Sequence, residues 1–161
     1  MTDPLEKWDG LMFQAVSESI EDMAFMEVLP NKDASGPTGL SGDVIRASLP
    51  VQDPVQGEFV ICLNKDLLIN IAETVYGPMV DELRDQNLFD LLGEILNTVV
   101  GRFMSAIVPG DRTFRLGLPI SGKGIAPEPL SPAYAWYYLI NDSDVYLAVS
   151  GESLPALRKM S

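Results

Sequence analysis

The chain has 161 residues, of which 47% are hydrophobic and 21% are charged, and this composition predicts one globular domain over residues 1–161, not a disordered segment. Its 11 Lys and Arg residues against 23 Asp and Glu residues give a formal net charge of −12, which repels phosphate backbones and anionic lipid headgroups alike. We therefore expect no nucleic-acid partner and no role at a membrane surface.

The absence of histidine narrows the possible chemistry further. Ser-His and Cys-His nucleophile pairs, imidazole metal sites and phosphohistidine relays all need a residue type that the chain lacks. The single cysteine, Cys62, lies in an apolar run and is predicted to be a small core residue and not a reactive thiol. The first residues do not resemble a signal peptide and no apolar stretch is long enough to span a membrane, so we expect a cytoplasmic location.

Hydrophobic periodicity predicts the elements of the first half in chain order. Apolar residues recur at steps of three and four over residues 11–29, which predicts an amphipathic helix that ends near Pro30. Residues 44–49 alternate as on a half-buried strand and residues 58–63 form a continuous β-prone run, so the two are expected to pair as a hairpin. Helical spacing returns over residues 67–75, and a Gly-Pro pair ends this shorter helix.

The second half is predicted to contain one long helix followed by three strands. Residues 83–108 are periodic and free of proline, which makes them the strongest helix prediction in the chain. Residues 113–120, 133–140 and 145–150 are predicted to be strands, separated by a Gly- and Pro-rich loop and by a tight turn. The order αββααβββ favours an α+β fold, in which an antiparallel or mixed sheet packs against a pair of long helices.

The aromatic segment 134–140 leaves two arrangements open. It is long and alternates poorly between polar and apolar residues. At the edge of the sheet, such a strand would invite pairing with a second subunit, whereas a buried central position explains its composition equally well.

The long helix carries its polar side chains on one narrow stripe. With Asp90 set at zero and about 100° per residue, Glu94 lies at roughly 40°, Asn97 at roughly −20° and Gly101 at roughly 20°. The rest of the circumference is mostly apolar, so the stripe is expected to face solvent or a partner. On spacing alone, ordinary surface remains the simpler interpretation. However, Gly101 in mid-helix costs about 1 kcal/mol relative to Ala, which suggests that another group approaches the backbone closely there.

A carboxylate and an amide one turn apart are suited to positioning a water molecule. The amide oxygen accepts a hydrogen bond from the water and the NH₂ group can donate to an oxyanion, as phosphoryl hydrolysis requires. The same pair cannot supply a nucleophile with its base, and two carboxylates alone make a poor metal cage.

Residues 90–97, with the sequence DLLGEILN, resemble the D/S-x-x-x-E-x-x-N signature of the CheC/CheX/FliY chemotaxis phosphatases. Pro119 follows at about the spacing that this signature expects, and Gly101 matches the small residue after the motif. The resemblance extends over most of the chain, from about residue 11 to residue 150. A lone E-x-x-N would be a weak signal, but the motif, the proline and the element order support one another.

The first helix contributes no second signature. It carries Glu18, Glu21 and Asp22, but no asparagine follows a glutamate by three residues. The chain therefore departs from the two-site CheC pattern and resembles single-site CheX. The three acidic side chains are predicted to form the solvated face of the helix.

The resemblance implies a phosphatase that acts on the phospho-aspartate of a CheY-like response regulator. Asn97 would position the attacking water, and Glu94 would pair with the lysine of the regulator's active site. Asp90 and Gly101 would flank the contact, while Pro119 would shape the fold and take no part in the chemistry. The family resemblance also implies that the regulator supplies Mg²⁺, that this chain binds no cofactor or metal, and that it forms a homodimer through a continuous sheet.

Two other interpretations stay open. The same fold could bind a response regulator without turnover, as a scaffold similar to the related flagellar switch proteins. Alternatively, an unrelated sensor or enzyme could place a pocket under the loop at residues 121–124. That loop resembles a phosphate cradle only superficially, since it lacks the ending of a P-loop and opens no helix, and it is predicted to be a hairpin turn.

Overall fold

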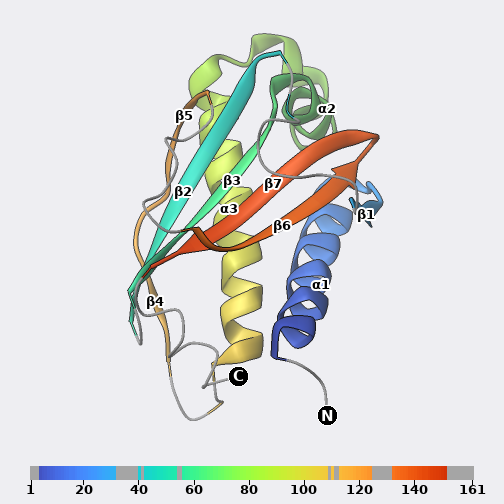
Figure 1. Cartoon of the computed structure of the whole chain (residues 1–161). Helices are drawn as coiled ribbons and strands as arrows, with labels where there is room; N and C mark the ends of the chain where they lie inside the picture. Colours follow the sequence, from blue (N-terminus) through green and yellow to red (C-terminus); the bar gives the residue numbers. More distant parts are fainter. Residues whose placement is uncertain are drawn as a thin grey trace.

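The computed structural model describes residues 4–31, 40, 42–53, 56–108, 110, 113–124 and 132–151. In these residues, seven strands form one antiparallel sheet in the order β1-β6-β7-β3-β2-β4, and β5 also pairs with β2. Helices α1 and α3 lie side by side against one face of this sheet (Figure 1). The elements are α1 Pro4–Ala24, β1 Val28–Pro30, β2 Val44–Asp53, β3 Gly57–Asn64, α2 Lys65–Tyr76, the 3₁₀-helix η2 Gly77–Glu82, α3 Asp85–Ile107, β4 Arg115–Leu116, β5 Ile120–Lys123, β6 Pro132–Ile140 and β7 Ser143–Ser150.

The predicted α+β class is confirmed. Two long helices, α1 with 21 residues and α3 with 23, pack against an antiparallel sheet. The helix predicted over residues 83–108 is α3, and the predicted hairpin is the pair of β2 and β3. None of the described helices is long and apolar enough to cross a bilayer.

The first helix ends earlier than predicted. It stops at Ala24 and does not continue to Leu29, because Phe25 adopts a φ of 56° in the left-handed region, which no helix continues through. The chain then forms the short strand β1, in which Val28 is buried and pairs with Ile140 of β6. Val28 continues the apolar spacing of the helix, so periodicity alone assigned it to the wrong element.

The segment predicted as one strand over residues 113–120 is divided into β4 and β5. Pro119 lies between them and lacks the N–H group that a continuous ladder would use. The prediction of a hairpin turn at residues 121–124 is wrong, because Ser121 to Lys123 belong to β5 and pair with β2. The Gly117 N–H donates to the Pro50 carbonyl at 2.7 Å, which ties the β4–β5 connection to the sheet.

The aromatic segment 134–140 forms most of β6 and lies inside the sheet, between β7 and β1. However, β1 is so short that it pairs only with Tyr138 to Ile140. One further backbone bond, from the Asn31 N–H to the Tyr137 carbonyl at 3.0 Å, extends the pairing by a residue. Each of the two predicted arrangements therefore describes only part of β6. Its second half lies between two strands, whereas its first residues have no partner strand on the β1 side among the described residues.

The core lies between the helices and the sheet and centres on Phe103 of α3. Its ring makes edge-to-face contacts with Trp8 of α1 at 5.6 Å between centroids, with Phe59 of β3 at 5.9 Å and with Trp136 of β6 at 5.8 Å. One side chain thus joins three other elements, and this packing holds α3 firmly against the sheet. On the opposite face of the sheet, Cys62 is buried in a smaller cluster, which confirms its predicted role in the core.

Candidate functional site

Helix α3 presents the predicted polar stripe. Asp90, Glu94 and Asn97 are all exposed. The side of the helix that packs on the sheet and on α1 is buried along its whole length, through Leu88, Leu91, Leu92, Gly93, Ile95, Leu96, Val99, Val100, Phe103, Met104 and Ile107. The stripe therefore points away from the core, and the buried side of the same helix holds it against the sheet and α1.

The carboxylate of Glu94 and the amide of Asn97 are available to a partner. Neither group takes part in a hydrogen bond or ion pair within the described part of the chain. The Thr98 hydroxyl donates to the backbone carbonyl of Glu94 at 2.9 Å, so this hydrogen bond does not involve the Glu94 carboxylate. Asp90 differs, because its carboxylate accepts a hydrogen bond from Gln86 at 2.8 Å.

Pro119 lies directly against the stripe helix, at Gly93. A Cβ atom added to Gly93 would come within 3.2 Å of the Pro119 Cβ and 3.3 Å of its Cγ. Beside this contact, the Ser121 hydroxyl donates to the Phe89 carbonyl at 2.9 Å. The β4–β5 connection is thus fastened to the turn of α3 that contains Asp90 and Glu94.

Gly93 is the supporting residue that the sequence analysis missed. It lies inside the DLLGEILN motif, but its importance comes from the contact with Pro119, 26 positions later in the chain. A glycine at roughly −60° from Asp90 on the helical wheel, next to the stripe, was the available signal. Its meaning depended on knowing that the β4–β5 connection packs against the helix there.

Gly101 does not mark a contact inside the domain. Nothing lies within 4 Å of the position that its Cβ would occupy, so the expected close approach is not made by any described residue. Instead, Gly101 lies in the floor of a shallow hollow between α3 and α1, which Asn97, Thr98, Ser105 and Ala106 of α3 also line.

The acidic side chains of α1 are exposed, as predicted, but two of them are not merely solvated. The Arg102 Nη1 lies 3.0 Å from Glu18 Oε2, and its Nη2 lies 2.9 Å from Asp22 Oδ2. Arg102 and Glu18 also line the hollow beside Asn97. One guanidinium group therefore bridges the two helices at the border of the candidate site.

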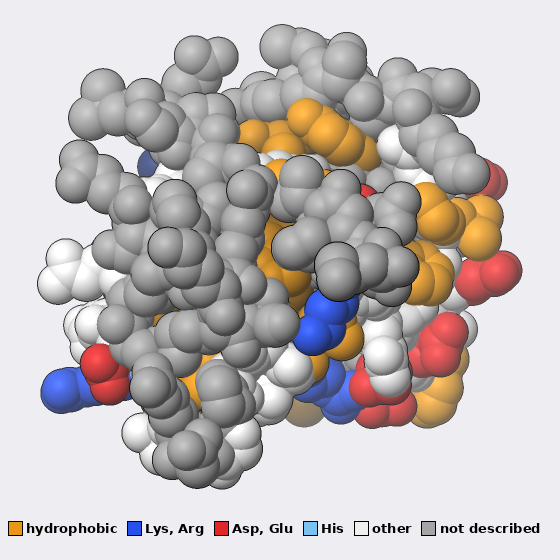
Figure 2. Space-filling view, turned by 60° about the horizontal axis from the view of Figure 1, so that its bottom comes forward, with side chains coloured by type: hydrophobic (Ala, Val, Ile, Leu, Met, Phe, Trp, Pro, Cys, Tyr) orange, Lys and Arg blue, Asp and Glu red, His pale blue; other side chains and the backbone are white. Residues whose placement is uncertain are grey.

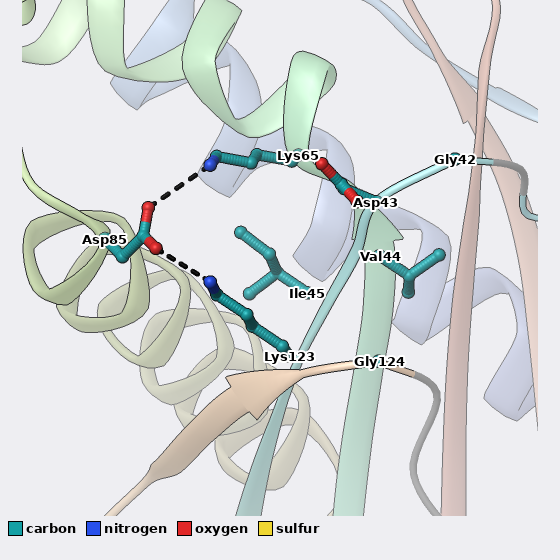
Figure 3. Close-up of a pocket in the computed structure, with 8 residues that line it drawn as sticks. All are labelled: Gly42, Asp43, Val44, Ile45, Lys65, Asp85, Lys123 and Gly124. Atoms are coloured by element: carbon teal, nitrogen blue, oxygen red, sulfur yellow. Dashed lines mark hydrogen bonds and ion pairs between the residues drawn. The ribbon is translucent and has the colours of Figure 1, made fainter.

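A second cluster lies at the N-terminal end of α3, in a pocket of about 350 Å³ (Figure 3). Asp85 is the first residue of α3, and its carboxylate forms two ion pairs. The Nζ of Lys65, at the start of α2, lies 3.2 Å from Oδ1, and the Nζ of Lys123, at the end of β5, lies 3.0 Å from Oδ2. The hydrogen bonds and charges of Lys123 and then Lys65 hold the pKa of Asp85 below its ordinary value, while Asp85 raises the pKa of Lys123. The cluster joins α2, α3 and β5, and both lysines are engaged with Asp85.

The described residues contain no group of three or more His, Cys, Asp or Glu side chains that could hold a metal ion. On the stripe, Asp90 and Glu94 are one helical turn apart and no third acidic side chain joins them. The arrangement offers two carboxylates, one amide and an open hollow, which suits contact with another macromolecule.

Solved structures share this architecture. Chemotaxis protein CheX from Desulfovibrio desulfuricans gives a TM-score of 0.70 at 18% identity, covering 89% of this chain and 98% of that chain. A CheC-like superfamily protein from Shewanella sp. PV-4 gives 0.68 at 21% identity, covering 94% and 100%. A chain of the CheX–CheY–BeF₃–Mg²⁺ complex from Borrelia burgdorferi gives 0.62 at 16% identity, covering 93% and 98%. At these identities, the similarity establishes the fold alone, and no curated protein matches the chain.

The antiparallel sheet with the helices on one of its faces is the fold that this chain shares with the CheC-like structure. Residues 45–130, slightly more than half of the 161-residue chain, match the family described as chemotaxis phosphatase CheX. The chain therefore belongs to the CheX family, and the resemblance drawn from the motif is confirmed. The matched residues include the stripe of α3 and Pro119.

Proposed function

We propose that this protein hydrolyses the phospho-aspartate of a CheY-like response regulator. The observation that carries the proposal is the pair of Glu94 and Asn97, exposed one turn apart on a helix whose other side is buried, and free of side-chain partners among the described residues. Membership of the CheX family and the presence of CheY in the complex of a relative support this choice of partner.

In this mechanism, Asn97 enters the regulator's active site and orients the attacking water. Its amide oxygen accepts a hydrogen bond from the water, while its NH₂ group can donate to a phosphoryl oxygen. An acyl phosphate is already labile, so positioning together with electrostatic stabilisation supplies the acceleration without a covalent intermediate. The rigid setting of α3, held by the packing around Phe103, keeps the entropic cost of this positioning low.

Glu94 pairs with the lysine of the regulator's active site and fixes the register of the two proteins. The separation of Glu94 and Asn97 along the helix axis is about 4.5 Å, so both can reach one active site. Asp90 and Gly101 flank this contact, and Pro119 supports the helix from the side. The Mg²⁺ ion belongs to the regulator in this scheme, and this chain supplies no ligand to it.

The decay of a phosphorylated CheY-type regulator from the same organism, in the presence of Mg²⁺, tests the proposal. Catalytic amounts of the wild-type chain should accelerate the decay, and Asn97→Ala should lower the acceleration by about 100-fold or more. Asn70→Ala, an amide on α2 outside the stripe, serves as the matched control and should keep the wild-type rate.

Two results would contradict the phosphatase assignment. If the wild-type chain binds the phosphorylated regulators of its organism but leaves their lifetimes unchanged, the protein is a docking module of the same fold. If decay accelerates equally with Asn97→Ala, the water is positioned by another group and the assigned role of Asn97 is wrong.

We further propose a homodimer formed by extension of the sheet at β6. The support is the short β1, which pairs with only three residues of β6 and leaves the edge before Tyr137 without a partner strand in the described part of the chain. Analytical ultracentrifugation at micromolar concentration should show a dimer, and Ala135→Pro should shift it toward monomer because proline cannot donate to a new ladder. A monomeric wild-type protein at that concentration would remove this proposal.

A further inference from the structure

The surface around Asn97 is acidic except at one position. Arg102 is the single Lys or Arg residue of α3, while Asp90 and Glu94 place two carboxylates on the stripe. Across the hollow, α1 exposes Glu18 and Asp22, with Glu21 beside them. Without Arg102, every charged side chain that borders this site on the two helices would be negative.

This charge pattern opposes the proposed substrate. A protein-bound phosphoryl group carries about −1.5 to −2 charges near pH 7. Each carboxylate near Asn97 repels it, and the net charge of −12 adds to the repulsion at longer range. A cation close to Asn97 is therefore the feature most able to lower the cost of bringing the phosphoryl group there.

Arg102 is held where it can do this. Its two terminal nitrogens bind Glu18 at 3.0 Å and Asp22 at 2.9 Å, so the guanidinium is fixed between α1 and α3. It lines the same hollow as Asn97, about 7.5 Å further along the helix axis. A guanidinium has five N–H donors, and the two ion pairs leave some of them available to a partner.

We propose that Arg102 is a positioning residue for the partner: it offsets part of the negative charge of the α1 carboxylates beside Asn97 and thereby admits the anionic phosphoryl group of the regulator. The inference rests on the proposed phosphatase function. It assigns to Arg102 the positive charge that lets an acidic protein accept an anionic substrate. Arg102 does not take part in the hydrolysis itself. It acts on the formation of the complex, so its effect belongs in KM and not in kcat.

A purely structural role is the competing explanation, since the same ion pairs connect α1 to α3. The side chains of Arg102, Glu18 and Asp22 are 35%, 49% and 68% exposed, and ion pairs at such exposure contribute little to stability. The helices are joined mainly by buried apolar contacts, including that of Trp8 with Phe103. Electrostatic and structural roles therefore make different predictions, which charge-changing variants can separate.

The test measures kcat and KM for a CheY-type regulator phosphorylated with acetyl phosphate, at about 0.01 M and about 0.3 M salt, where the Debye lengths are about 30 Å and under 10 Å. Arg102→Gln should raise KM about threefold at low salt, as expected for one charge on the order of 10 Å from a dianion in water with a Debye length of about 30 Å. At high salt the increase should fall below about 1.5-fold, and kcat should stay within about twofold of wild type. Arg115→Gln removes the same charge from an exposed position on β4, at the sheet edge opposite β1, and should leave KM nearly unchanged.

A triple variant decides between the two roles. Arg102→Gln with Glu18→Gln and Asp22→Asn removes the cation and both of its carboxylates, so the local charge changes from −1 to 0. If Arg102 acts through charge, KM returns to the wild-type value or falls below it. If Arg102 acts as a clamp between the helices, the triple variant stays as impaired as Arg102→Gln, and the inference is overturned.

The same measurements distinguish the inference from the function on which it rests. If the wild-type chain binds the regulator activated with BeF₃⁻ but does not accelerate dephosphorylation, the phosphatase proposal fails. The inference about Arg102 is then tested on the dissociation constants of the same variants in place of KM. An Arg102→Gln effect of equal size at both salt concentrations contradicts the inference while leaving the phosphatase intact. If the wild-type chain neither binds nor dephosphorylates the regulators of its organism, both fail.

Discussion

Tyr138 shows how a single polar atom can be costly in this core. The residue is only 4% exposed, and its hydroxyl has no hydrogen-bond partner among the described residues. Burial raises its pKa well above the ordinary tyrosine value, with smaller effects from Asp9 and Tyr134, so the phenol stays neutral throughout the working pH range. Burying an unpaired hydroxyl opposes folding because the group loses its bonds to water.

We therefore expect Tyr138→Phe to be neutral or to raise the free energy of unfolding by up to about 1 kcal/mol. Tyr134→Phe is the matched control on the same strand, since the Tyr134 hydroxyl donates to Asp9 at 2.8 Å. That variant should lower the free energy of unfolding by about 1 kcal/mol. Urea denaturation measures both, and a clear loss of stability in Tyr138→Phe would mean that its hydroxyl has a partner in solution.

At the scale of elements, α3 contains two glycines in opposite environments. Gly93 is buried under Pro119, whereas the Cβ position of Gly101 is open. Glycine has a low helix propensity at both positions, but only at Gly93 does a described residue occupy the space of the missing side chain. At Gly93 the missing side chain makes room for the β4–β5 connection, and at Gly101 no described residue uses the space.

The same substitution should consequently have different effects at the two positions. Gly101→Ala is expected to stabilise the protein by about 1 kcal/mol, because the helix gains propensity without a clash. At Gly93→Ala, the new Cβ at 3.2 Å from Pro119 should cancel that gain or reverse it. The difference between the two variants in thermal or urea unfolding is the quantity to measure, and equal stabilisation at both positions would show that Pro119 does not press on α3.

The extent to which sequence predicted this structure also depends on the element. The helix α3 and its stripe follow from periodicity and helical geometry, which are local, so both were predicted closely. The end of α1 was predicted near Pro30 and lies at Ala24, because Phe25 adopts a positive φ without a sequence signal of the kind that glycine gives. The contacts of Pro119 with Gly93 and of Arg102 with α1 join distant parts of the chain, and spacing along the sequence carries no information about them.

At the scale of the whole molecule, some of the acidic residues lie beside cations in spite of the acidic surplus. On the face shown in Figure 2, Lys and Arg side chains lie next to Asp and Glu side chains at the lower right, and hydrophobic groups reach the surface between them. The same pairing recurs at Asp85 and at Arg102. Local charge therefore differs from the net charge of −12, and it is local charge that a docking partner meets.

The burial of Cys62 has a practical consequence for following such a partner in solution. The only thiol of the chain is 1% exposed and so is shielded from labelling reagents. A cysteine introduced on the open floor at Gly101 would be the one accessible thiol, without any need to remove the native one. A fluorophore or spin label attached there would sit beside Asn97 and report directly on what enters the hollow.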